Sequence, residues 1–261
     1  RYEEQSHIVS THFQQEGFLP IKTPTIELQT SLSPGLGPTL RKDSIQFFTP
    51  SGELAMLRPD HTTPIAQIVA TQMTDASVPI KLYYCDPVFR KCDRESEIYQ
   101  AGCEYIGEGS STIDADVISL CIESLKALGY DGDDIGVDIG HISMTEGLSE
   151  EKRKALLDGD YLTFGSIPDR GDTSILDKES ELSEVYDHLQ AKGYGDTIKL
   201  NLGLVKGLYY YTGIIFEVYI KGHRNIVASG GRYDQLVKQF GKSYPAVGFA
   251  INLNALRGAN T

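Results

Sequence analysis

Strand-like and helix-like patterns are mixed along this chain without a regular βαβα alternation. Apolar residues recur at helical spacing in residues 2–17 and 62–73, whereas residues 80–84 and 99–106 read as strands. The period then changes, and the last part of the chain contains three segments typical of antiparallel strands, at 199–205, 214–221 and 225–228. A doubly wound parallel sheet requires regular alternation, so this order favours an antiparallel α+β fold.

Other segments are predicted from local signals. Residues 29–43 are rich in Ser, Gly and Pro and predict a loop, whereas Ser51-Gly52 predicts the turn of a hairpin. Asp114 is expected to cap a helix that ends at Gly129. The spacing of apolar residues also predicts two C-terminal helices, at 232–240 and 249–256.

The length of the chain and its cysteines limit its class. With 261 residues, of which 40% are hydrophobic, the chain can bury the core of one large domain or two small ones. No apolar run approaches the roughly 18 residues of a membrane-spanning helix. Residue 1 is Arg inside a predicted helix, so we expect the N-terminus to be incomplete. The four cysteines form no CxxC pair, which favours a reduced, cytoplasmic environment over a zinc ribbon or a disulfide framework.

The formal net charge of −12 is unevenly distributed along the chain. Residues 93–198 carry a net charge of −17, whereas residues 199–261 carry +6. The acidic middle opposes binding to a nucleic-acid backbone, which requires clustered Lys and Arg. The plain alternative is that this part of the chain is a solvated helical surface.

Several generic site motifs are incomplete. Gly241-Lys242-Ser243 lacks the leading glycine of a phosphate-binding loop, and the chain contains neither HExxH nor GxSxG. The six histidines are scattered, so we expect them to be structural or at the surface, and no metal site is predicted.

Seven short blocks occur in a recognisable order. They are LRPDHT at 57–62, KLYY with PVFR at 81–90, QAGCE at 100–104, DADVI at 114–118, LVKGLYYYTG with FE at 204–217, SGGRYD at 229–234 and PAVGFA at 245–250. With these blocks the chain resembles the catalytic domain of histidyl-tRNA synthetase over nearly its whole length, roughly residues 1–257. The resemblance implies a class II aminoacyl-tRNA synthetase-like fold, in which helices flank an antiparallel sheet. Because the match covers nearly the whole chain, which stops at Thr261, we expect a single domain over residues 1–261 without an anticodon-binding domain.

A histidine pocket is also implied by the resemblance. Asp60 stands where the family has an acidic residue near the α-amino group of the ligand, with Thr62 beside it. Gln100 and Glu104 match a pair that faces the ligand, and positions four apart on a strand share one face. Pro24 matches the proline of the family's first motif, at a homodimer interface. The other implied pocket residues are Arg90, Lys206, Tyr210, Tyr211 and Tyr233. Without the resemblance, ordinary sheet packing would explain these side chains.

Other positions depart from the synthetase pattern where that family binds the phosphates of ATP. Lys206 stands in place of a catalytic Arg, and Lys does not replace Arg where phosphate is bound in two places. Tyr209 replaces an Asp, Ala255 falls opposite the Arg of the third motif, and residues 91–99 form a short, acidic loop. The departures remove much of the phosphate machinery and spare most of the amino-acid pocket.

This combination resembles the regulatory subunit of short-form ATP phosphoribosyltransferase. The resemblance implies a chain without synthetase activity or cofactor that joins a catalytic subunit in a hetero-octamer. It would support the first step of histidine biosynthesis and relay feedback inhibition by histidine. Two alternatives remain open. One is a truncated histidyl-tRNA synthetase or related amino-acid-activating ligase, in which Lys206 or Arg257 supplies the missing cation. The other is a pure interaction module.

Overall fold

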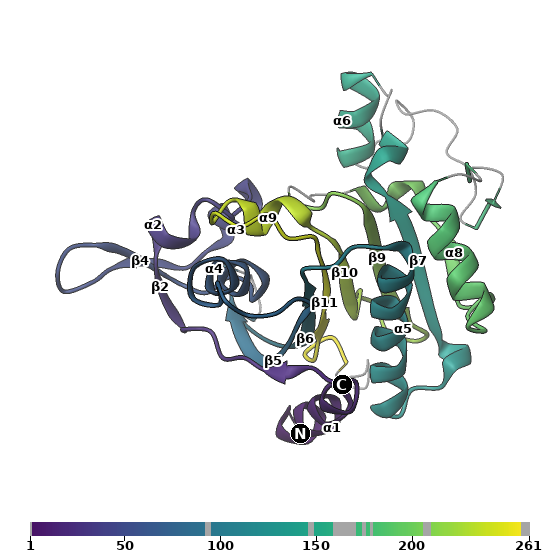
Figure 1. The fold of residues 1–261 in the computed structure, drawn as a ribbon, viewed down its shortest axis with the longest axis horizontal. Helices are drawn as coiled ribbons and strands as arrows, with labels where there is room; N and C mark the ends of the chain where they lie inside the picture. The colour runs from purple at the N-terminus through teal and green to yellow at the C-terminus, as the bar shows by residue number, and fades with distance from the viewer. Residues whose placement is uncertain are drawn as a thin grey trace.

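The computed structural model describes residues 2–91, 95–145, 149–158, 171–173, 176–177, 180–205 and 210–256. Within them the chain forms a sheet of eight strands in the order β1-β5-β6-β11-β10-β9-β7-β8 (Figure 1). Neighbours are antiparallel except for the edge pairs β1–β5 and β7–β8, which are parallel. The predicted α+β fold with a mainly antiparallel sheet is therefore confirmed. The strands are β1 (Leu19–Pro20), β5 (Ile80–Phe89), β6 (Glu97–Ile106), β7 (Ile135–His141), β8 (Ile198–Leu200), β9 (Ile214–Ile220), β10 (Ala228–Arg232) and β11 (Ala246–Asn252).

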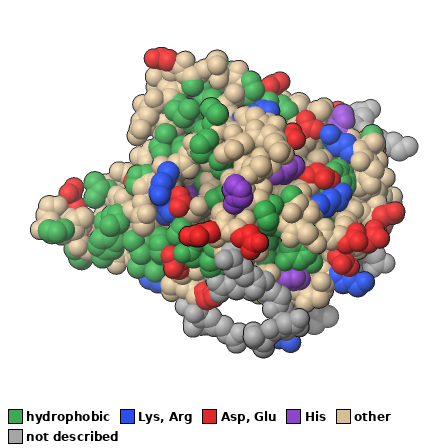
Figure 2. Space-filling model, turned by 90° about the horizontal axis from the view of Figure 1, so that it is seen from below, with side chains coloured by type: hydrophobic (Ala, Val, Ile, Leu, Met, Phe, Trp, Pro, Cys, Tyr) green, Lys and Arg blue, Asp and Glu red, His purple; other side chains and the backbone are tan. Residues whose placement is uncertain are grey.

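A smaller three-stranded sheet projects at one end of the molecule (Figure 1). Its order is β2-β4-β3, formed by β2 (Ile26–Leu28), β3 (Gln46–Phe48) and β4 (Leu54–Leu57). Strands β3 and β4 are antiparallel neighbours, and the predicted hairpin at Ser51-Gly52 is confirmed. Hydrophobic side chains gather over this end of the molecule (Figure 2), and Ile26 and Phe48 are 56% and 73% exposed.

Three helices cover one face of the large sheet: α1 (Tyr2–Gln15), α5 (Ser111–Ala127) and α8 (Glu181–Ala191). Their buried side chains and those of the facing strands form the main core. Phe13 of α1, Leu125 of α5 and Leu189 of α8 are fully buried, as is Phe216 of β9. The apolar residues of α5 recur every three or four positions, so one side of the helix can bury them continuously.

The opposite face is covered by α4 (Thr62–Gln72) and α9 (Asp234–Lys238), which pack on β5 through a second buried cluster. Pro64 lies in the first turn of α4, where its missing N–H breaks no helical hydrogen bond. No helix among the described residues is long and apolar enough to cross a membrane. The remaining helices are α2 (Gln29–Leu32), α3 (Pro38–Asp43), α6 (Glu150–Asp158) and the 3-10 helices Gly132–Asp134, Ile142–Thr145 and Leu202–Val205.

Of the two helices predicted near the C-terminus, the one at 249–256 is wrong and the one at 232–240 is shorter than predicted. Residues 246–252 form β11, which pairs with β6 on one side and β10 on the other. Val247, Phe249 and Ile251 alternate toward the main core, so the two-residue period of a central strand fits them. The segment 232–240 begins with the last residue of β10 and continues into α9, which is only five residues long.

Three smaller predictions also need correction. The loop expected over 29–43 contains α2 and α3, and Pro38 starts α3 as a first-turn proline. The cap of α5 is Ser110, whose hydroxyl accepts from the Ile113 amide at 3.3 Å, and Asp114 lies inside the first turn. The segment 199–205 is not an antiparallel strand, because Ile198–Leu200 pairs in parallel with β7 and a 3-10 helix follows.

Candidate functional site

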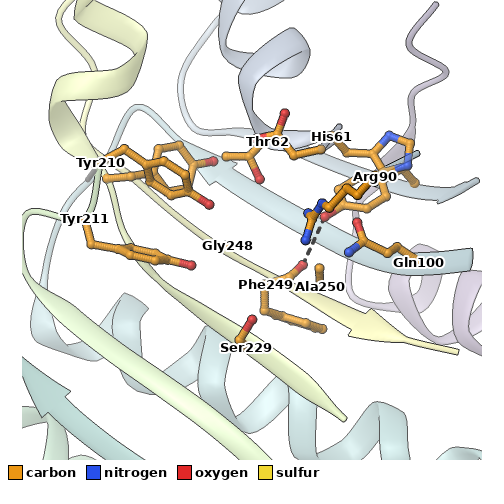
Figure 3. Close-up of a pocket in the computed structure, with 13 residues that line it drawn as sticks. His61, Thr62, Arg90, Gln100, Tyr210, Tyr211, Ser229, Gly248, Phe249 and Ala250 are labelled. Atoms are coloured by element: carbon orange, nitrogen blue, oxygen red, sulfur yellow. Dashed lines mark hydrogen bonds between the residues drawn. The ribbon is translucent and has the colours of Figure 1, made fainter. Parts of the chain in front are cut away.

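A small pocket opens on the sheet face that carries α4 and α9. Strands β6, β10 and β11 form its floor, and the turn before α4 and the segment before β9 form its walls. Its cavity volume is about 100 Å³, so only a small ligand would fit. The lining residues are Asp60, His61, Thr62, Tyr84, Arg90, Gln100, Tyr210, Tyr211, Ser229, Tyr233, Gly248, Phe249 and Ala250 (Figure 3).

Strand register explains how the floor is built. Gly248 of β11 is the cross-strand partner of Glu104 on β6, and Gln100 pairs with Asn252. Gln100 and Glu104 share one face of β6, as their spacing predicts. A Cβ atom on Gly248 would overlap the Glu104 carboxylate and lie 2.5 Å from the Cys103 carbonyl oxygen. Glycine at 248 therefore leaves the space in which the Glu104 side chain lies.

Asp60 supplies the pocket with a buried carboxylate that lacks a full set of partners. It is 5% exposed, and its Oδ2 accepts from the Thr63 hydroxyl at 2.7 Å and the Thr63 amide at 3.4 Å. No donor among the described residues reaches Oδ1. Burial raises the pKa of Asp60, against the opposing effects of Thr63 and the Arg90 charge. An unpaired buried acceptor costs free energy, so a cationic donor at Oδ1 would be favourable.

The second carboxylate, Glu104, is 1% exposed and fully paired. Its Oε1 accepts from the Thr62 hydroxyl at 2.7 Å, and its Oε2 accepts from the Tyr233 hydroxyl. Burial raises the pKa of Glu104 to about 8. The two hydrogen bonds act to lower this pKa, whereas the charge of the nearby Asp60 acts to raise it. Glu104 therefore holds the hydroxyls of two pocket residues in place.

Tyrosines form the other wall of the pocket. The ring centroid of Tyr210 lies 4.7 Å from that of Tyr211 and 6.1 Å from that of Tyr233, and the rings of Tyr210 and Tyr233 meet edge to face. Burial raises the pKa of each of these three phenols, so they are neutral and can donate or accept hydrogen bonds. Figure 3 shows the Tyr211 hydroxyl pointing across the floor toward the strands.

His61 and Tyr84 also line the pocket but were not predicted as site residues. Their rings stack at 4.2 Å, and the His61 Nε2 lies 3.0 Å from the Asp86 carbonyl oxygen. Burial lowers the pKa of His61 to about 3, so its ring is neutral. Tyr84 and Ser229 belong to the sequence blocks at 81–90 and 229–234, but only the register of the strands reveals that they face the pocket.

The structure brings together most of the predicted site residues. Seven of them line the pocket, and Glu104 lies against Thr62 and Tyr233. Lys206 lies outside the described residues, as do Tyr209 and Arg257. Pro24 is exposed, lies between β1 and β2, and does not line the pocket. The seven lining residues are Asp60, Thr62, Arg90, Gln100, Tyr210, Tyr211 and Tyr233.

Among the described residues that line the pocket, Arg90 carries the positive charge. Its Nε donates to the Pro59 carbonyl oxygen at 2.6 Å, which fixes the guanidinium beside the turn that carries Asp60. The rest of the guanidinium fork can bind a carboxylate or phosphate. Within the described residues, no group of three or more His, Cys, Asp or Glu side chains could hold a metal ion.

Comparison with known proteins gives consistent results. The family profile described as Histidyl-tRNA synthetase matches residues 1–158 and 170–256. Proteins named ATP phosphoribosyltransferase regulatory subunit from Halothermothrix orenii and Symbiobacterium thermophilum are each 33% identical to this chain over 94% of its length. The aligned regions span 69% and 72% of those proteins.

Solved structures share the fold. A protein described as an ATP phosphoribosyltransferase regulatory subunit/histidyl-tRNA synthetase from Bacillus halodurans C matches with a TM-score of 0.87 and 26% identity, over 98% of this chain and 79% of that one. The apo histidyl-tRNA synthetase of S. aureus matches with a TM-score of 0.72 and 20% identity, over 98% and 64% of the two chains, and supports the fold alone. By sequence identity over nearly its whole length, this chain belongs to the ATP phosphoribosyltransferase regulatory subunits, a family with the histidyl-tRNA synthetase fold.

Proposed function

We propose that this chain is a non-catalytic subunit that supports the catalytic subunit of ATP phosphoribosyltransferase and makes it sensitive to histidine. The relatives carry the name of that regulatory subunit. The observation that carries the sensing role is Asp60, a buried carboxylate in a small pocket with one oxygen free of donors among the described residues.

The pocket offers a complementary group for each part of free histidine. The α-ammonium would donate to Asp60 Oδ1, and the α-carboxylate would accept from Arg90 and Gln100. The imidazole would lie against the tyrosine wall, where the hydroxyls of Tyr211 and Tyr233 can serve its two nitrogens. Histidine could shift the assembly only to the extent that it binds one quaternary state more tightly than another.

We further propose that the chain does not activate amino acids. Adenylate formation depends on fixed cations around the phosphates of ATP. Arg90 is the one cation among the described pocket-lining residues, since His61 is neutral. Histidine-dependent ATP–pyrophosphate exchange should therefore be absent from the isolated chain. Clear exchange would instead support the amino-acid-activating ligase.

Self-association is a further part of the proposal. Pro24 lies in an exposed segment flanked by Leu19 and Ile26, which are 66% and 56% exposed. Apolar side chains exposed together on one segment are typical of an interface. We propose that two copies pair along this segment and that such pairs assemble with the catalytic subunit into the hetero-octamer.

The test is reconstitution with a catalytic subunit of the short form. We expect phosphoribosyltransferase activity only in the mixture, and we expect histidine to lower it. Asp60→Asn keeps the shape of the side chain but removes the charge. It should raise the histidine dissociation constant of the isolated chain, measured by calorimetry, by about tenfold to a hundredfold.

Asp187→Asn, an exposed carboxylate on α8, is the control and should bind histidine like the wild type. Wild-type protein that gives no binding heat and no thermal shift with histidine would contradict the sensing role. Activity that is the same with and without this chain would contradict the supporting role.

A further inference from the structure

Arg232 is an almost fully buried arginine next to the pocket that does not line it. Ser229 on β10 and Tyr233 directly after it contribute to the pocket, whereas the Arg232 side chain reaches the opposite side and meets α5. Its Nη2 and Nε donate to the two carboxylate oxygens of Asp114 at 2.7 and 3.2 Å. The side chains of Arg232 and Asp114 are 5% and 0% exposed, so this is a two-point ion pair inside the protein.

A second carboxylate completes the cluster. Arg232 Nη1 donates to Asp234 Oδ1 at 3.2 Å, and the same oxygen accepts from the Ala246 amide at 2.9 Å. The Arg232 stem lies so close to Gly213 that a Cβ atom there would be 3.0 Å from Arg232 Cδ. The surrounding backbone therefore closely fits the extended arginine.

Backbone groups of Arg232 and the two residues after it bond to the segments on both sides of the tyrosine wall. The Thr212 amide donates to the Arg232 carbonyl oxygen at 2.7 Å, and the Asp234 amide donates to the Thr212 hydroxyl at 3.0 Å. The Tyr233 amide donates to the Ala246 carbonyl oxygen at 2.7 Å. Thr212 directly follows Tyr211, so the bonds around Arg232 determine where Tyr211 and Tyr233 can lie.

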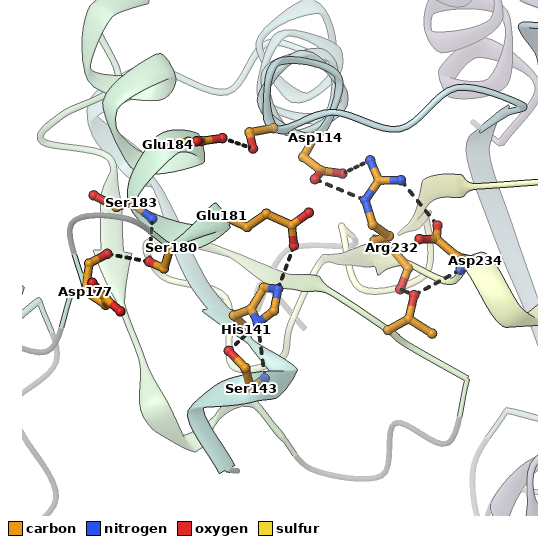
Figure 4. A network of polar contacts seen from close by, with 12 residues as sticks. Asp114, His141, Ser143, Asp177, Ser180, Glu181, Ser183, Glu184, Arg232 and Asp234 are labelled. Atoms are coloured by element: carbon orange, nitrogen blue, oxygen red, sulfur yellow. Dashed lines mark hydrogen bonds and ion pairs between the residues drawn. The ribbon is translucent and has the colours of Figure 1, made fainter.

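On the far side of the sheet, the cluster continues into the helical layer. Asp114 lies in the first turn of α5, and its neighbour Ser111 donates to Glu184 of α8 at 2.6 Å (Figure 4). Thr112 also lies 3.1 Å from His188 Nε2 on α8. The start of α5 is thus bonded to α8 on one side and to Arg232 on the other.

A buried ion pair is poor evidence of a gain in stability, because desolvation offsets its attraction. Its geometric requirement is strict, since both charges must keep their partners. We propose that Arg232 is a positioning residue: through Asp114 and Asp234 it holds the pocket tyrosines in their binding geometry and joins the pocket to α5 and α8. The effect on histidine affinity rests on the proposed function, whereas the positioning of the tyrosines does not.

The first measurement is amide hydrogen exchange of the ligand-free chain. In Asp114→Asn, exchange should become faster by about tenfold in peptides that cover 210–212 and 228–234, and stay unchanged in β7. The matched control is Asp116→Asn, also on α5, which breaks an ion pair to Lys192 at 2.9 Å without touching β10. It should leave the pocket peptides unchanged. Wild-type exchange in folded Asp114→Asn, or an equal rise across β7, would overturn the proposal.

The second measurement is histidine binding by calorimetry. Asp114→Asn should raise the histidine dissociation constant by at least about fivefold, and Asp116→Asn should not. If Asp114→Asn does not fold, Arg232→Lys takes its place, because it keeps the charge but loses the two-point contact. Unchanged affinity in a folded variant would overturn the role in binding. Absence of binding heat from the wild type would instead contradict the proposed function and leave the exchange result standing.

Discussion

At the scale of single residues, the pocket contains two buried carboxylates in different situations. Glu104 has a hydroxyl on each oxygen, whereas Asp60 Oδ1 has no donor among the described residues. A ligand cation would therefore gain more at Asp60, and Glu104 would act mainly by holding Thr62 and Tyr233. The two carboxylates differ in their hydrogen-bond partners and not in their burial, because both side chains are almost completely removed from solvent.

The raised pKa of Glu104 predicts how stability depends on pH. Burial raises the pKa from the ordinary value of 4.5 to about 8. Between these pH values the folded chain keeps a proton that the unfolded chain has released. The free energy of unfolding should therefore fall as pH rises through this window, by at most about 1.4 kcal/mol per pH unit, and level off above it. Urea denaturation of ligand-free protein between pH 5 and pH 9, at roughly unit steps, measures this slope.

Glu104→Gln is neutral at every pH in this range, so its slope should be shallower than that of the wild type. The pKa of Asp60 is also raised by burial, so part of the slope should remain. Glu151→Gln, on the exposed side of α6, should retain the wild-type slope. Equal slopes for wild type and Glu104→Gln would show that Glu104 does not hold the proton.

The side chains of the pocket differ in how far the sequence could predict them. Asp60 and Thr62 lie in one block, and Gln100 and Glu104 are four apart on one strand, so the resemblance to histidyl-tRNA synthetase indicated all four. Gly248, Ser229 and Tyr84 enter the pocket through pairing between distant strands. A single sequence contains no direct signal of that register, although the blocks that carry these residues were identified.

At the scale of elements, the long helices with one apolar side and the central strands β6 and β9 were predictable, whereas the central strand β11 was not. The predicted helix at 62–73 is α4, and the helix that ends before Gly129 is α5. Residues 249–256 have apolar positions at both strand and helix spacing. The chain forms a strand there because β11 pairs with both β6 and β10. If β11 were a helix, the facing backbone N–H and C=O groups of β6 and β10 would lack partners in the sheet.

Two glycines of the large sheet differ in the space around them, so substitution by alanine should destabilise the chain at Gly248 but not at Gly136. In Gly248→Ala, the new methyl group would overlap the Glu104 carboxylate, so we expect a loss of about 1–3 kcal/mol of unfolding free energy. Histidine binding should weaken with it, because Glu104 must move. Gly136→Ala on β7 is the control, since nothing lies within 4 Å of its added Cβ. Its stability should stay within about 0.5 kcal/mol of the wild type.

Urea denaturation and calorimetric titration of both variants measure these effects. If Gly248→Ala keeps the stability and the histidine affinity of the wild type, the space beside Glu104 is needed neither for the fold nor for histidine binding.

At the scale of the whole molecule, the large sheet has the main hydrophobic core on one face and the candidate binding pocket on the other. Helices α1, α5 and α8 bury the main core against one face, and the other face keeps the pocket between the strands and α4. The segment from β1 to β3 runs from one edge of the large sheet into the small sheet and carries most of the exposed large apolar side chains of the described residues: Leu19, Ile26, Phe47 and Phe48. Burying such a segment against water-exposed apolar surface of a second copy would remove the cost of exposing it.

This arrangement predicts that self-association depends on the β1–β3 segment. Wild-type chain should behave as a dimer by light scattering after size exclusion, because the exposed apolar side chains of this segment can form the apolar centre of an interface. Replacing Leu19 and Phe48 together by Ser should shift the mass toward that of one chain at micromolar concentration. Both side chains are exposed in the single chain, at 66% and 73%, so their loss should leave its melting temperature nearly unchanged.

Ile226→Ser provides the control, since Ile226 is also exposed, at 39%, but lies in the turn between β9 and β10. It should leave the dimer intact. If the double variant remains a dimer, the interface lies elsewhere. If the wild type is a monomer, the proposed self-association is contradicted. If the double variant is a monomer that still binds histidine, sensing belongs to the pocket of each chain. The coupling to the catalytic subunit would then require the paired state, because only the assembly offers two quaternary states that histidine can distinguish.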